Sequence, residues 1–427
     1  MMKTASLVLV VLFVLSALLV ASTGSVAAAD TGCTHTYSAP PAQQWTISSP
    51  GIYCLKAGTY NTQINITASN VLLTPAPGTK AGQVIIEPSS VLENNFINWY
   101  FGAEPQAAII LAGSSDGSSL TGISITNLVI DGAKASSSLD NYAVCTTDYA
   151  GINLNGASGS IVNDLVRNIY LPVDQAGCGN GGGINVDTNN VGTTETVTIA
   201  NNVVANYNII GIGCFDSGVV CNIRNNAVSI YVPYTPFDPG PGGIVIYGAL
   251  GRIFGNTVSG NECSIPVECG PDYITQYQGD GIITYYSGTG TFVIGNTVIN
   301  NGVGIYTEAD TALTAGNVVQ NSVWEGLVLF DGTYTPLANR ISGSPLAILV
   351  GSDGFVDNPV VCHLSFNDFI GTFSEAIVQD VAYTGEYGYG GPYVEPATAT
   401  IDGLSVTVTP GPSGTPSYVN ITSLPGW

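Results

Sequence analysis

"GNTVINNGVGIYTE", residues 295 to 308, holds the pattern that decides the fold of this chain. The pattern returns as "GNTVSGNEC" at 255 to 263 and as "GNVVQNSVWEGLVLFDG" at 316 to 332. In each copy an Asn precedes two mostly apolar residues, and Asn317 follows Asn296 by 21 residues. A fixed period in the low twenties is typical of a solenoid, in which each repeat packs only on its neighbours.

Two anchors define the repeat. The Asn anchors are Asn127, Asn163, Asn202, Asn226, Asn256, Asn296, Asn317, Asn339 and Asn367. The Gly anchors are Gly151, Gly183, Gly211, Gly243, Gly281, Gly304 and Gly326. After each Gly, apolar residues alternate with period two, as in "GINVDT" at 183 to 188, which favours strands over helices. Leucine-rich repeats have a similar period, but their regular Leu skeleton is missing.

Short strands that return one rung higher after tight turns predict an all-β chain folded as a parallel β-helix. We expect each repeating Asn to lie at a turn, because Asn tolerates the left-handed backbone conformation. We also expect the Asn amides to form a ladder from coil to coil, with Asn296 and Asn317 one strand spacing apart.

The segment "WTISSPGIYCLKAGTYNTQINITASNVLLTPAPG", residues 45 to 78, carries a family resemblance. It resembles the entry segment of secreted right-handed parallel β-helix proteins of the pectin-lyase-like and NosD-like superfamily, and the Asn repeats resemble their coils. The resemblance spans roughly Trp45 to Gln379 and implies the fold. It implies no single function, because this fold hosts lyases, hydrolases, epimerases, adhesins and scaffolds.

The superfamily's enzyme motifs are mostly missing. The Gly-His-Gly and Arg-x-Lys motifs of its polygalacturonase-like members do not occur, and "NVDT" at 185 to 188 matches only part of their first Asp motif. Its lyases place calcium-binding carboxylates beside a basic residue, so the resemblance leaves Ca²⁺ open. We otherwise expect no cofactor, and with only two His and no CxxC we expect no metal site in the manner of zinc proteins.

The N-terminus predicts export. Residues 1–29 combine Lys3, an apolar run from Leu7 to Val20 and a small-residue end, as in a secretory signal peptide. A retained membrane anchor is the alternative, although the run is short for a span. We expect residues 30–60 to form an N-terminal cap, 61–380 the β-helix and 381–427 a C-terminal cap or tail. The cleaved chain would have no membrane span and would be extracellular or at the cell surface.

The charge balance is strongly acidic. Eight Lys and Arg face 30 Asp and Glu, for a net charge of −22, so nucleic acid is an improbable partner. Charged residues make up only 9% of the chain, and the surface must therefore consist largely of uncharged polar groups.

Nine Cys in an exported chain predict disulfides with one thiol left over. The spacings pair Cys33 with Cys54, Cys145 with Cys178, Cys214 with Cys221 and Cys263 with Cys269, and leave Cys362 unpaired. Asn65 and Asn420 lie in N-x-Thr sequons and are candidate glycosylation sites.

Four coils are longer than the rest. The insertions follow Asn127, Asn163, Asn226 and Asn256, precede the next Gly anchor, and therefore lie at one corner. Loops grouped on one side of a rigid solenoid often carry binding residues, but they can also be tolerated decoration.

The fourth residue after each Gly anchor should point outward. That row is Asn155, Asp187, Phe215, Tyr247, Tyr285, Glu308 and Phe330. A stripe of aromatic rings bounded by carboxylates suits stacked sugar rings. The alternative is that stacking only stabilises the sheet.

Asp187 and Asp216 are the candidate catalytic residues. They lie on successive coils one position out of register, which could place them about 5 to 9 Å apart, as in glycoside hydrolysis. The ring of Phe215 could raise the pKa of one of them. Asp280, at the end of the longest insertion, is a further candidate at the rim. The alternative is a pair of solvated surface acids.

Two functions remain open at this point. The first is binding or processing of an extracellular polysaccharide, with hydrolysis favoured over elimination because bases are few. The second is a non-enzymatic cell-surface or matrix protein that uses the solenoid as a rigid rod. The oligomeric state is not predicted.

Overall fold

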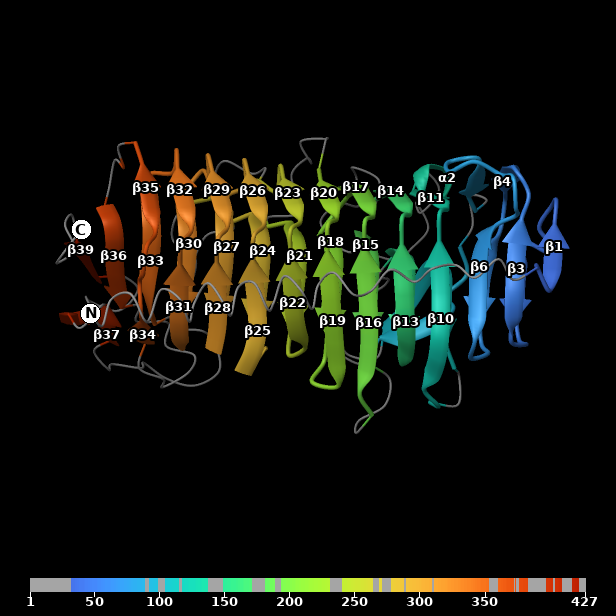
Figure 1. Cartoon of the computed structure of the whole chain (residues 1–427), viewed down its shortest axis with the longest axis horizontal. Helices are drawn as coiled ribbons and strands as arrows, with labels where there is room; N and C mark the ends of the chain where they lie inside the picture. The colour runs from blue at the N-terminus through green and yellow to red at the C-terminus, as the bar shows by residue number, and fades with distance from the viewer. Residues whose placement is uncertain are drawn as a thin grey trace, which may run out of the picture.

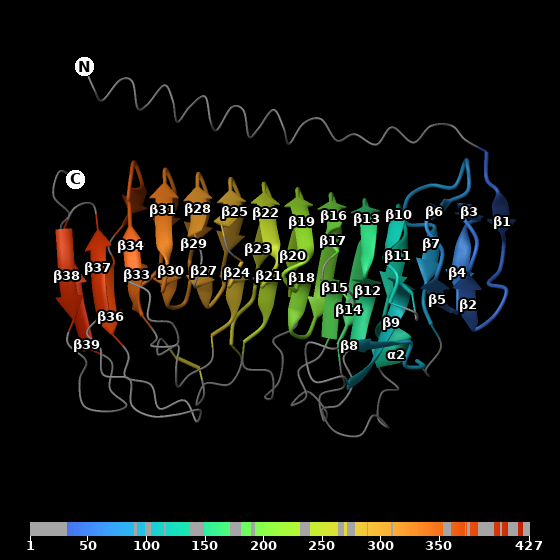
Figure 2. The same ribbon diagram turned by 90° about the horizontal axis from the view of Figure 1, so that it is seen from below.

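Three long sheets dominate the computed structural model. It describes residues 32–88, 92–98, 104–114, 117–136, 149–170, 181–188, 193–230, 240–263, 269–270, 278–287, 289–308, 311–352, 360–371, 373, 376–382, 397–401, 404–408 and 417–421. The coils follow one another along the long axis, from β1 (His35–Tyr37, blue) to β39 (Ser417–Ile421, red) (Figure 1). The view from below shows the same order (Figure 2).

Sheet A is defined here by the strand that follows the Gly-anchored strand in each coil. Its strands in spatial order are β1, β3 (Gly51–Leu55), β6 (Val71–Pro75), β10 (Leu120–Thr126), β13 (Ala157–Val162), β16 (Glu195–Ala200), β19 (Val219–Arg224), β22 (Leu250–Phe254), β25 (Thr289–Ile294), β28 (Thr311–Ala315), β31 (Thr333–Leu337), β34 (Val360–Cys362), β37 (Ala397–Ile401) and β38 (Leu404–Val408).

Sheet B contains the strands that begin at or beside the Gly anchors. Its strands are β2 (Gln44–Ile47), β5 (Gln63–Ile66), β9 (Glu104–Gly113), β12 (Tyr149–Asn155), β15 (Gly181–Asp187), β18 (Ile210–Phe215), β21 (Gly242–Tyr247), β24 (Asp280–Tyr285), β27 (Val303–Glu308), β30 (Glu325–Phe330), β33 (Leu346–Ser352), β36 (Ala376–Ala382) and β39, with β8 (Phe96–Asn98) paired to β9.

Sheet C contains the short strands that follow the Asn anchors. Its strands are β4 (Gly58–Tyr60), β7 (Val84–Ile86), β11 (Val129–Asp131), β14 (Leu165–Ile169), β17 (Val203–Tyr207), β20 (Ala227–Ser229), β23 (Thr257–Ser259), β26 (Thr297–Ile299), β29 (Val318–Gln320), β32 (Arg340–Ser342) and β35 (Asp368–Ile370). A short helix, α2 (Ala133–Ser136), follows β11.

Each coil runs from sheet B to sheet A to sheet C. The coil of β24, β25 and β26 pairs in parallel with the coil of β27, β28 and β29. Because the strands of the coils pair in parallel with those of the next coil along the chain, the fold is a parallel β-helix. The predicted all-β, single-stranded right-handed parallel β-helix with end caps is confirmed.

Apolar side chains from all three sheets fill the interior. Ile282 of β24, Val293 of β25 and Val298 of β26 are completely buried in one continuous cluster that extends along the helix. Full burial of such a side chain stabilises the folded chain by about 1.5–3 kcal/mol, so the coils hold together mainly through these stacked Ile and Val residues.

The Asn ladder exists. Asn296 Nδ2 donates to Asn317 Oδ1 at 3.0 Å and to the carbonyl of Ile253 at 3.0 Å. The predicted stacking of Asn296 on Asn317 is therefore confirmed. The ladder residues are Asn202, Asn226, Asn256, Asn296, Asn317, Asn339 and Asn367.

The predicted left-handed conformation of the ladder residues is wrong. The residue before each ladder position has the positive φ instead, as at Gly295 (φ 65°) and Gly316 (φ 62°). The reason is that two adjacent residues have different roles. The left-handed residue bends the chain, and the next residue can then point its amide inward to the neighbouring coil. Asn127 and Asn163, with φ of 60° and 61°, occupy the left-handed position that bends the chain and are not ladder residues.

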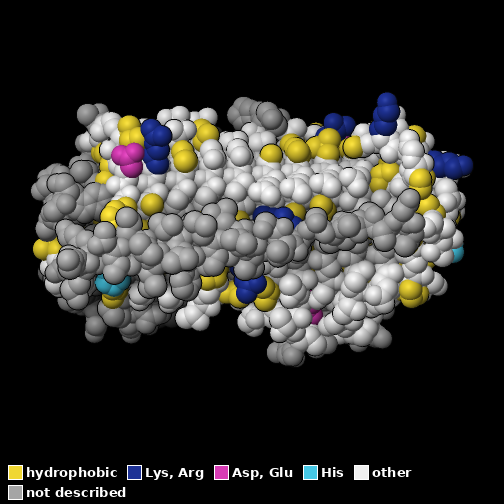
Figure 3. Space-filling view, viewed as in Figure 1, with side chains coloured by type: hydrophobic (Ala, Val, Ile, Leu, Met, Phe, Trp, Pro, Cys, Tyr) yellow, Lys and Arg dark blue, Asp and Glu magenta, His cyan; other side chains and the backbone are white. Residues whose placement is uncertain are grey.

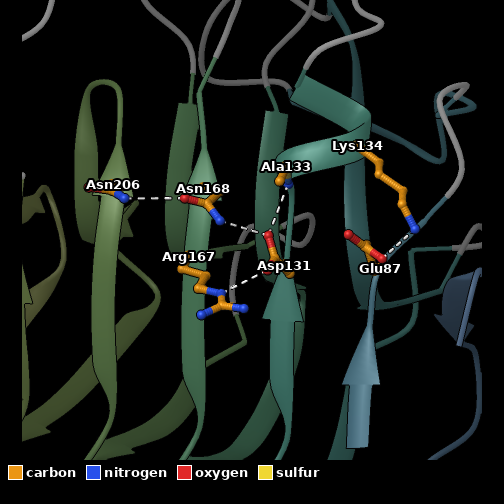
Figure 4. A network of polar contacts seen from close by, with 7 residues as sticks. All are labelled: Glu87, Asp131, Ala133, Lys134, Arg167, Asn168 and Asn206. Carbon is orange, nitrogen blue, oxygen red and sulfur yellow. Dashed lines mark hydrogen bonds and ion pairs between the residues drawn. The ribbon is translucent and has the colours of Figure 1, made fainter. Parts of the chain in front are cut away.

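A polar network joins three neighbouring strands of sheet C, β11, β14 and β17, near α2 (Figure 4). The carboxylate of Asp131 accepts hydrogen bonds from Arg167 Nε at 2.7 Å, Asn168 Nδ2 at 2.8 Å and the Ala133 amide at 3.0 Å. Asn206 Nδ2 extends the network to the next coil by donating to Asn168 Oδ1 at 3.2 Å. Lys134 pairs with Glu87 at 2.6 Å and ties α2 to an earlier coil.

The two ends of the chain pair their strands in different ways. Near the N-terminal end, strands β2, β3 and β4 contribute to the three sheets, and the predicted bounds of the caps stay predictions. At the other end, β38 pairs antiparallel with β37, and β39 pairs antiparallel with β36. No helix in the described part of the chain is long and apolar enough to cross a membrane. The predicted signal peptide, residues 1–29, lies outside the described residues.

Disulfides pin turns, as predicted. Cys33–Cys54, Cys214–Cys221 and Cys263–Cys269 are confirmed, and Cys362 is a buried thiol in β34. Cys145 and Cys178 lie outside the described residues, so their pairing stays a prediction.

Candidate functional site

The outer face of sheet B, opposite the interior, is the candidate site. Alternate residues of its strands point away from the main core and form a second apolar cluster on this face. The cluster contains Phe215, Val245, Ile283, Val303, Tyr306, Val328, Phe330, Leu346 and Leu349, with Ile210, Tyr247 and Tyr285 packed against it.

The predicted row is one row in the structure. Asn155 pairs with Asp187, and further along the sheet the register joins Phe215, Tyr247, Tyr285, Glu308 and Phe330. The prediction that this row is an open stripe is wrong, because Phe215, Glu308 and Phe330 are buried and only Tyr247 and Tyr285 are half-buried. Side chains of the adjacent outward row pack against it, which the alternation of one strand does not reveal.

Aromatic rings form a continuous chain on this face. The ring of Tyr285 lies 5.8 Å from Tyr247 and 5.0 Å from Tyr306, and Tyr306 lies 5.9 Å from Phe330. Tyr286 joins the chain at 5.8 Å from Tyr247 and is 40% exposed. Sequence reasoning missed Tyr286 and Tyr306, because they lie beside the single row that it followed.

Tyr306 also fixes the carboxylate of Glu308. Its hydroxyl donates to Glu308 Oε2 at 2.5 Å, and both residues are buried. Glu308 is therefore held within the aromatic chain rather than at its open edge. Tyr306 and Glu308 stand two positions apart in "GIYTE", so both side chains lie on the outer face of the same strand.

A polar group of side chains lies at the other end of the face, on β12 and β15. Asn153 Nδ2 donates to Asp187 Oδ2 at 2.9 Å. The Oδ1 atoms of Asn153, Asn155 and Asn185 are buried and have no hydrogen-bond partner. Asn153 is completely buried, so its amide oxygen faces a protein environment without a donor. Most buried oxygens in proteins accept a hydrogen bond, so these three are exceptions.

Glycines make room for this polar group. A Cβ at Gly182 would lie 2.6 Å from Asn185 Nδ2, and a Cβ at Gly213 would lie 2.5 Å from the Phe215 ring and 3.1 Å from Asn185 Oδ1. Asn185 thus lies over bare backbone beside the first ring of the row. Sequence reasoning missed Asn153 and Asn185, although "GINLN" and "GINVD" place them at matching positions.

Asp187 and Asp216 have different surroundings. Asp187 is buried on the outer face with Asn153, whereas Asp216 is half-buried in the turn between β18 and β19. Asp216 Oδ2 accepts a hydrogen bond from the Thr188 amide at 3.3 Å, which brings it beside the residue that follows Asp187. Burial raises the pKa of Asp216, and the negative charge of Glu195 adds to the effect. Their catalytic roles stay predictions.

Asp280 is not at a rim. It begins β24, is 4% exposed, and shares a row of the outer face with Val303. Burial raises its pKa to about 7. The longest insertion ends directly before a strand, so its last acid becomes part of the sheet.

The four insertions share one corner, as predicted. Each connects sheet C to sheet B: β11 to β12, β14 to β15, β20 to β21 and β23 to β24. Most insertion residues lie outside the described part of the chain. Among the described residues, no three His, Cys, Asp or Glu side chains cluster as metal ligands.

The two sequons differ in accessibility. Asn65 is half-buried in β5, where its Oδ1 accepts a hydrogen bond from Asn95 Nδ2 at 2.7 Å. Asn420 is exposed in β39. Glycosylation stays a prediction at both positions, and Asn420 is the more accessible acceptor.

No protein-family model matches this sequence, and no curated protein sequence matches it. Solved structures resemble it at low sequence identity. The A-module of mannuronan C-5 epimerase AlgE4 from Azotobacter vinelandii is 12% identical with a TM-score of 0.44, covering 78% of this chain and 83% of that chain. The surface adhesin PfbA of Streptococcus pneumoniae is 12% identical with a TM-score of 0.33, covering 84% and 90%. Similarities this weak carry no argument about what this chain binds.

Proposed function

We propose that this chain is a secreted protein that binds a polysaccharide along the outer face of sheet B. The observation that carries the proposal is the aromatic chain, in which Tyr286 is 40% exposed, on the same face as the partnerless amide oxygens of Asn153, Asn155 and Asn185. Sugar hydroxyls are donors for such oxygens, and the apolar faces of sugar rings stack on aromatic side chains. One ligand class therefore satisfies both ends of the face.

The arrangement of the two ends supports a polymeric ligand. The polar group lies on β12 and β15, and the half-buried rings of Tyr247 and Tyr285 lie on β21 and β24. Adjacent strands are about 4.8 Å apart, so a ligand that reaches from β12 to β24 spans four strand spacings, or roughly 19 Å. A chain of several sugars has that length, whereas a monosaccharide does not.

Secretion is part of the proposal. Three disulfides form among the described residues, and such bonds persist in oxidising compartments. The sequence of residues 1–29 has the features of a signal peptide. On the face in Figure 3, the Lys and Arg side chains are scattered among uncharged atoms.

Hydrolysis of the bound polysaccharide is the second candidate function. It is favoured by the hydrogen bond from the Thr188 amide to Asp216, which brings a carboxyl of raised pKa beside the residue after Asp187. A protonated acid and an ionised partner are what glycoside hydrolysis requires. If no glycan binds, the alternative function is that of a non-enzymatic rod at the cell surface.

A glycan array of acidic and neutral polysaccharides tests the proposal. We expect the secreted protein to bind at least one polymer, and we expect Tyr247→Ala and Asn153→Ala each to weaken binding at least tenfold. Tyr37→Ala is the matched control, because Tyr37 is also a half-buried tyrosine in ring contacts but lies on β1 at the far end. If no polymer binds, or if the control weakens binding as much, the proposal fails.

A further inference from the structure

A second group of oxygen atoms lies at the corner between sheets B and A. Glu195, the first residue of β16, has no exposed surface. Its Oε1 accepts hydrogen bonds from Thr193 Oγ1 at 2.7 Å and from Ser119 Oγ at 3.1 Å. Its Oε2 is buried and has no hydrogen-bond partner. Burying a carboxylate with one oxygen unsatisfied is costly unless a cation or a proton compensates.

Asp216 brings a second carboxylate to this corner from the next coil. The backbone places it there, because the Glu195 amide donates to the carbonyl of Gly218, two residues after Asp216, at 2.9 Å, and Glu195 pairs with Val219 in the parallel register. The interactions of these two acids in the structure are with hydroxyls and one backbone amide. The three ion pairs among the described residues involve other acids, namely Glu87, Asp131 and Asp368.

Gly218 lies close to the unsatisfied oxygen, where only a residue without a Cβ fits. A Cβ at this position would lie 2.6 Å from the Thr193 carbonyl oxygen and 3.5 Å from Glu195 Oε2. The Thr193 carbonyl oxygen and Glu195 Oε2 therefore lie near the same point of the Gly218 backbone. The disulfide Cys214–Cys221 closes the turn that carries Asp216 and Gly218, so the turn is held in place.

We propose that Glu195 and Asp216, together with the Thr193 carbonyl, bind a divalent cation of the Ca²⁺ type at this corner. The donors are all oxygens, which hard cations such as Ca²⁺ prefer, and Ca²⁺ accepts the mixed carboxylate and carbonyl set. The ion would supply the positive charge that the two acids lack. Water would complete its coordination.

Isothermal titration of the secreted protein with CaCl₂, after treatment with EDTA and dialysis, tests the site. We expect the wild type to bind one Ca²⁺ per chain and Glu195→Gln to bind it at least tenfold more weakly. Gln has nearly the size of Glu and keeps one acceptor oxygen in the place of Oε1. Asp164→Asn is the matched control, because it also removes a buried carboxyl but lies at the corner between β13 and β14. No binding of Ca²⁺ at millimolar concentration overturns the proposal.

Asp216→Asn keeps the test decisive if Glu195→Gln fails to fold. Asn tolerates the positive φ of 76° at this half-buried turn position, so we expect a folded variant with at least a tenfold loss of Ca²⁺ affinity. Undiminished affinity in this variant would contradict the site. Glycan binding measured in EDTA tests the outer face of sheet B separately. The glycan proposal and the cation proposal can therefore fail independently of one another.

Discussion

Asp164 takes the place of an Asn in the ladder. Its Oδ1 accepts a hydrogen bond from the Leu128 amide at 2.7 Å, and its own amide donates to Asn202 Oδ1 at 2.8 Å. Burial raises its pKa to about 8, although the amide hydrogen bonds oppose the rise. An Asn at this position would donate from Nδ2, as Asn202 does. Asp164 can donate only when it is protonated, so the folded chain favours the neutral acid.

Asp164→Asn should therefore change how stability depends on pH. Between about pH 4 and pH 8 the unfolded chain releases a proton that the folded chain keeps, so the wild type loses about 1.4 kcal/mol per pH unit from this group as pH rises. The variant should lose less, and it should exceed the wild type in stability at pH 8. Urea unfolding at pH 5 and pH 8 measures both slopes. Asp368→Asn, an exposed acid in β35, serves as the control; equal slopes for Asp164→Asn and wild type would refute the assignment.

The substitution Asp187→Asn tests whether the protein hydrolyses the bound polysaccharide. If the bound polysaccharide is cleaved with Asp187 as the ionised partner, turnover should fall by roughly 10²–10⁴-fold, the range for loss of an acid or base. Binding through Tyr247 and Tyr285 should change little, because Asn keeps the acceptor for Asn153 Nδ2. Reducing-end release and glycan affinity, measured together, separate the two effects. Full turnover in the variant would remove Asp187 from the mechanism.

The bend between sheets A and C is the element that sets the repeat. Most coils place Asn or Gly at the left-handed position, but Ala338 and Phe366 occupy it with φ of 53° and 57°. Left-handed backbone costs an ordinary residue roughly 1–2 kcal/mol. These two coils therefore carry strain that the others avoid, and they lie near the C-terminal end of the solenoid.

Phe366→Asn should relieve that strain. Phe366 is 67% exposed, so little packing is lost, and the free energy of unfolding should rise by about 1 kcal/mol. Val323→Asn, also at an exposed apolar position but without positive φ, should give no such gain. Thermal or urea unfolding of both variants decides the matter. A destabilised Phe366→Asn would mean that the ring is needed where it lies.

The elements of the fold were largely predictable, and the reason is local. Period-two alternation after each Gly fixes which residues face the core, so the strands and their register follow from the repeat. The ladder was placed one residue off at Asn127 and Asn163 because bending and ladder positions are adjacent and both accept Asn. In the doublets Asn201–Asn202 and Asn225–Asn226, the first Asn has the left-handed conformation and the second belongs to the ladder. The sequence pattern alone does not distinguish these two positions.

At the scale of the whole molecule, stacked coils create properties that no single repeat has. The candidate site is one of them, because its rows cross many strands. Alternation predicted which side chains share the outer face, but burial there depends on packing between rows. That is why Phe330 and Glu308 proved buried, and why Tyr306 was missed although its ring contacts Tyr285 and Phe330 of the predicted row.

The whole chain should be more stable in mild acid than in mild base. The pKa values of buried Asp164 and Asp280 are raised to about 8 and about 7, so both ionise at a cost as pH rises. Falling pH also reduces the repulsion within a chain of net charge −22. We expect the Tm to be several degrees higher at pH 5 than at pH 8, measured by scanning calorimetry. An equal or lower Tm at pH 5 would contradict this account of the buried acids.

The central claim is that the outer face of sheet B holds a polysaccharide. The most direct measurement is a crystal structure of the protein with an oligosaccharide of the polymer that the array identifies. We predict sugar hydroxyls within hydrogen-bond distance of the Asn153, Asn155 or Asn185 amide oxygens, and a sugar ring stacked on Tyr247 or Tyr285. An oligosaccharide bound only on the faces of sheet A or sheet C, with the outer face of sheet B unchanged, would contradict the claim.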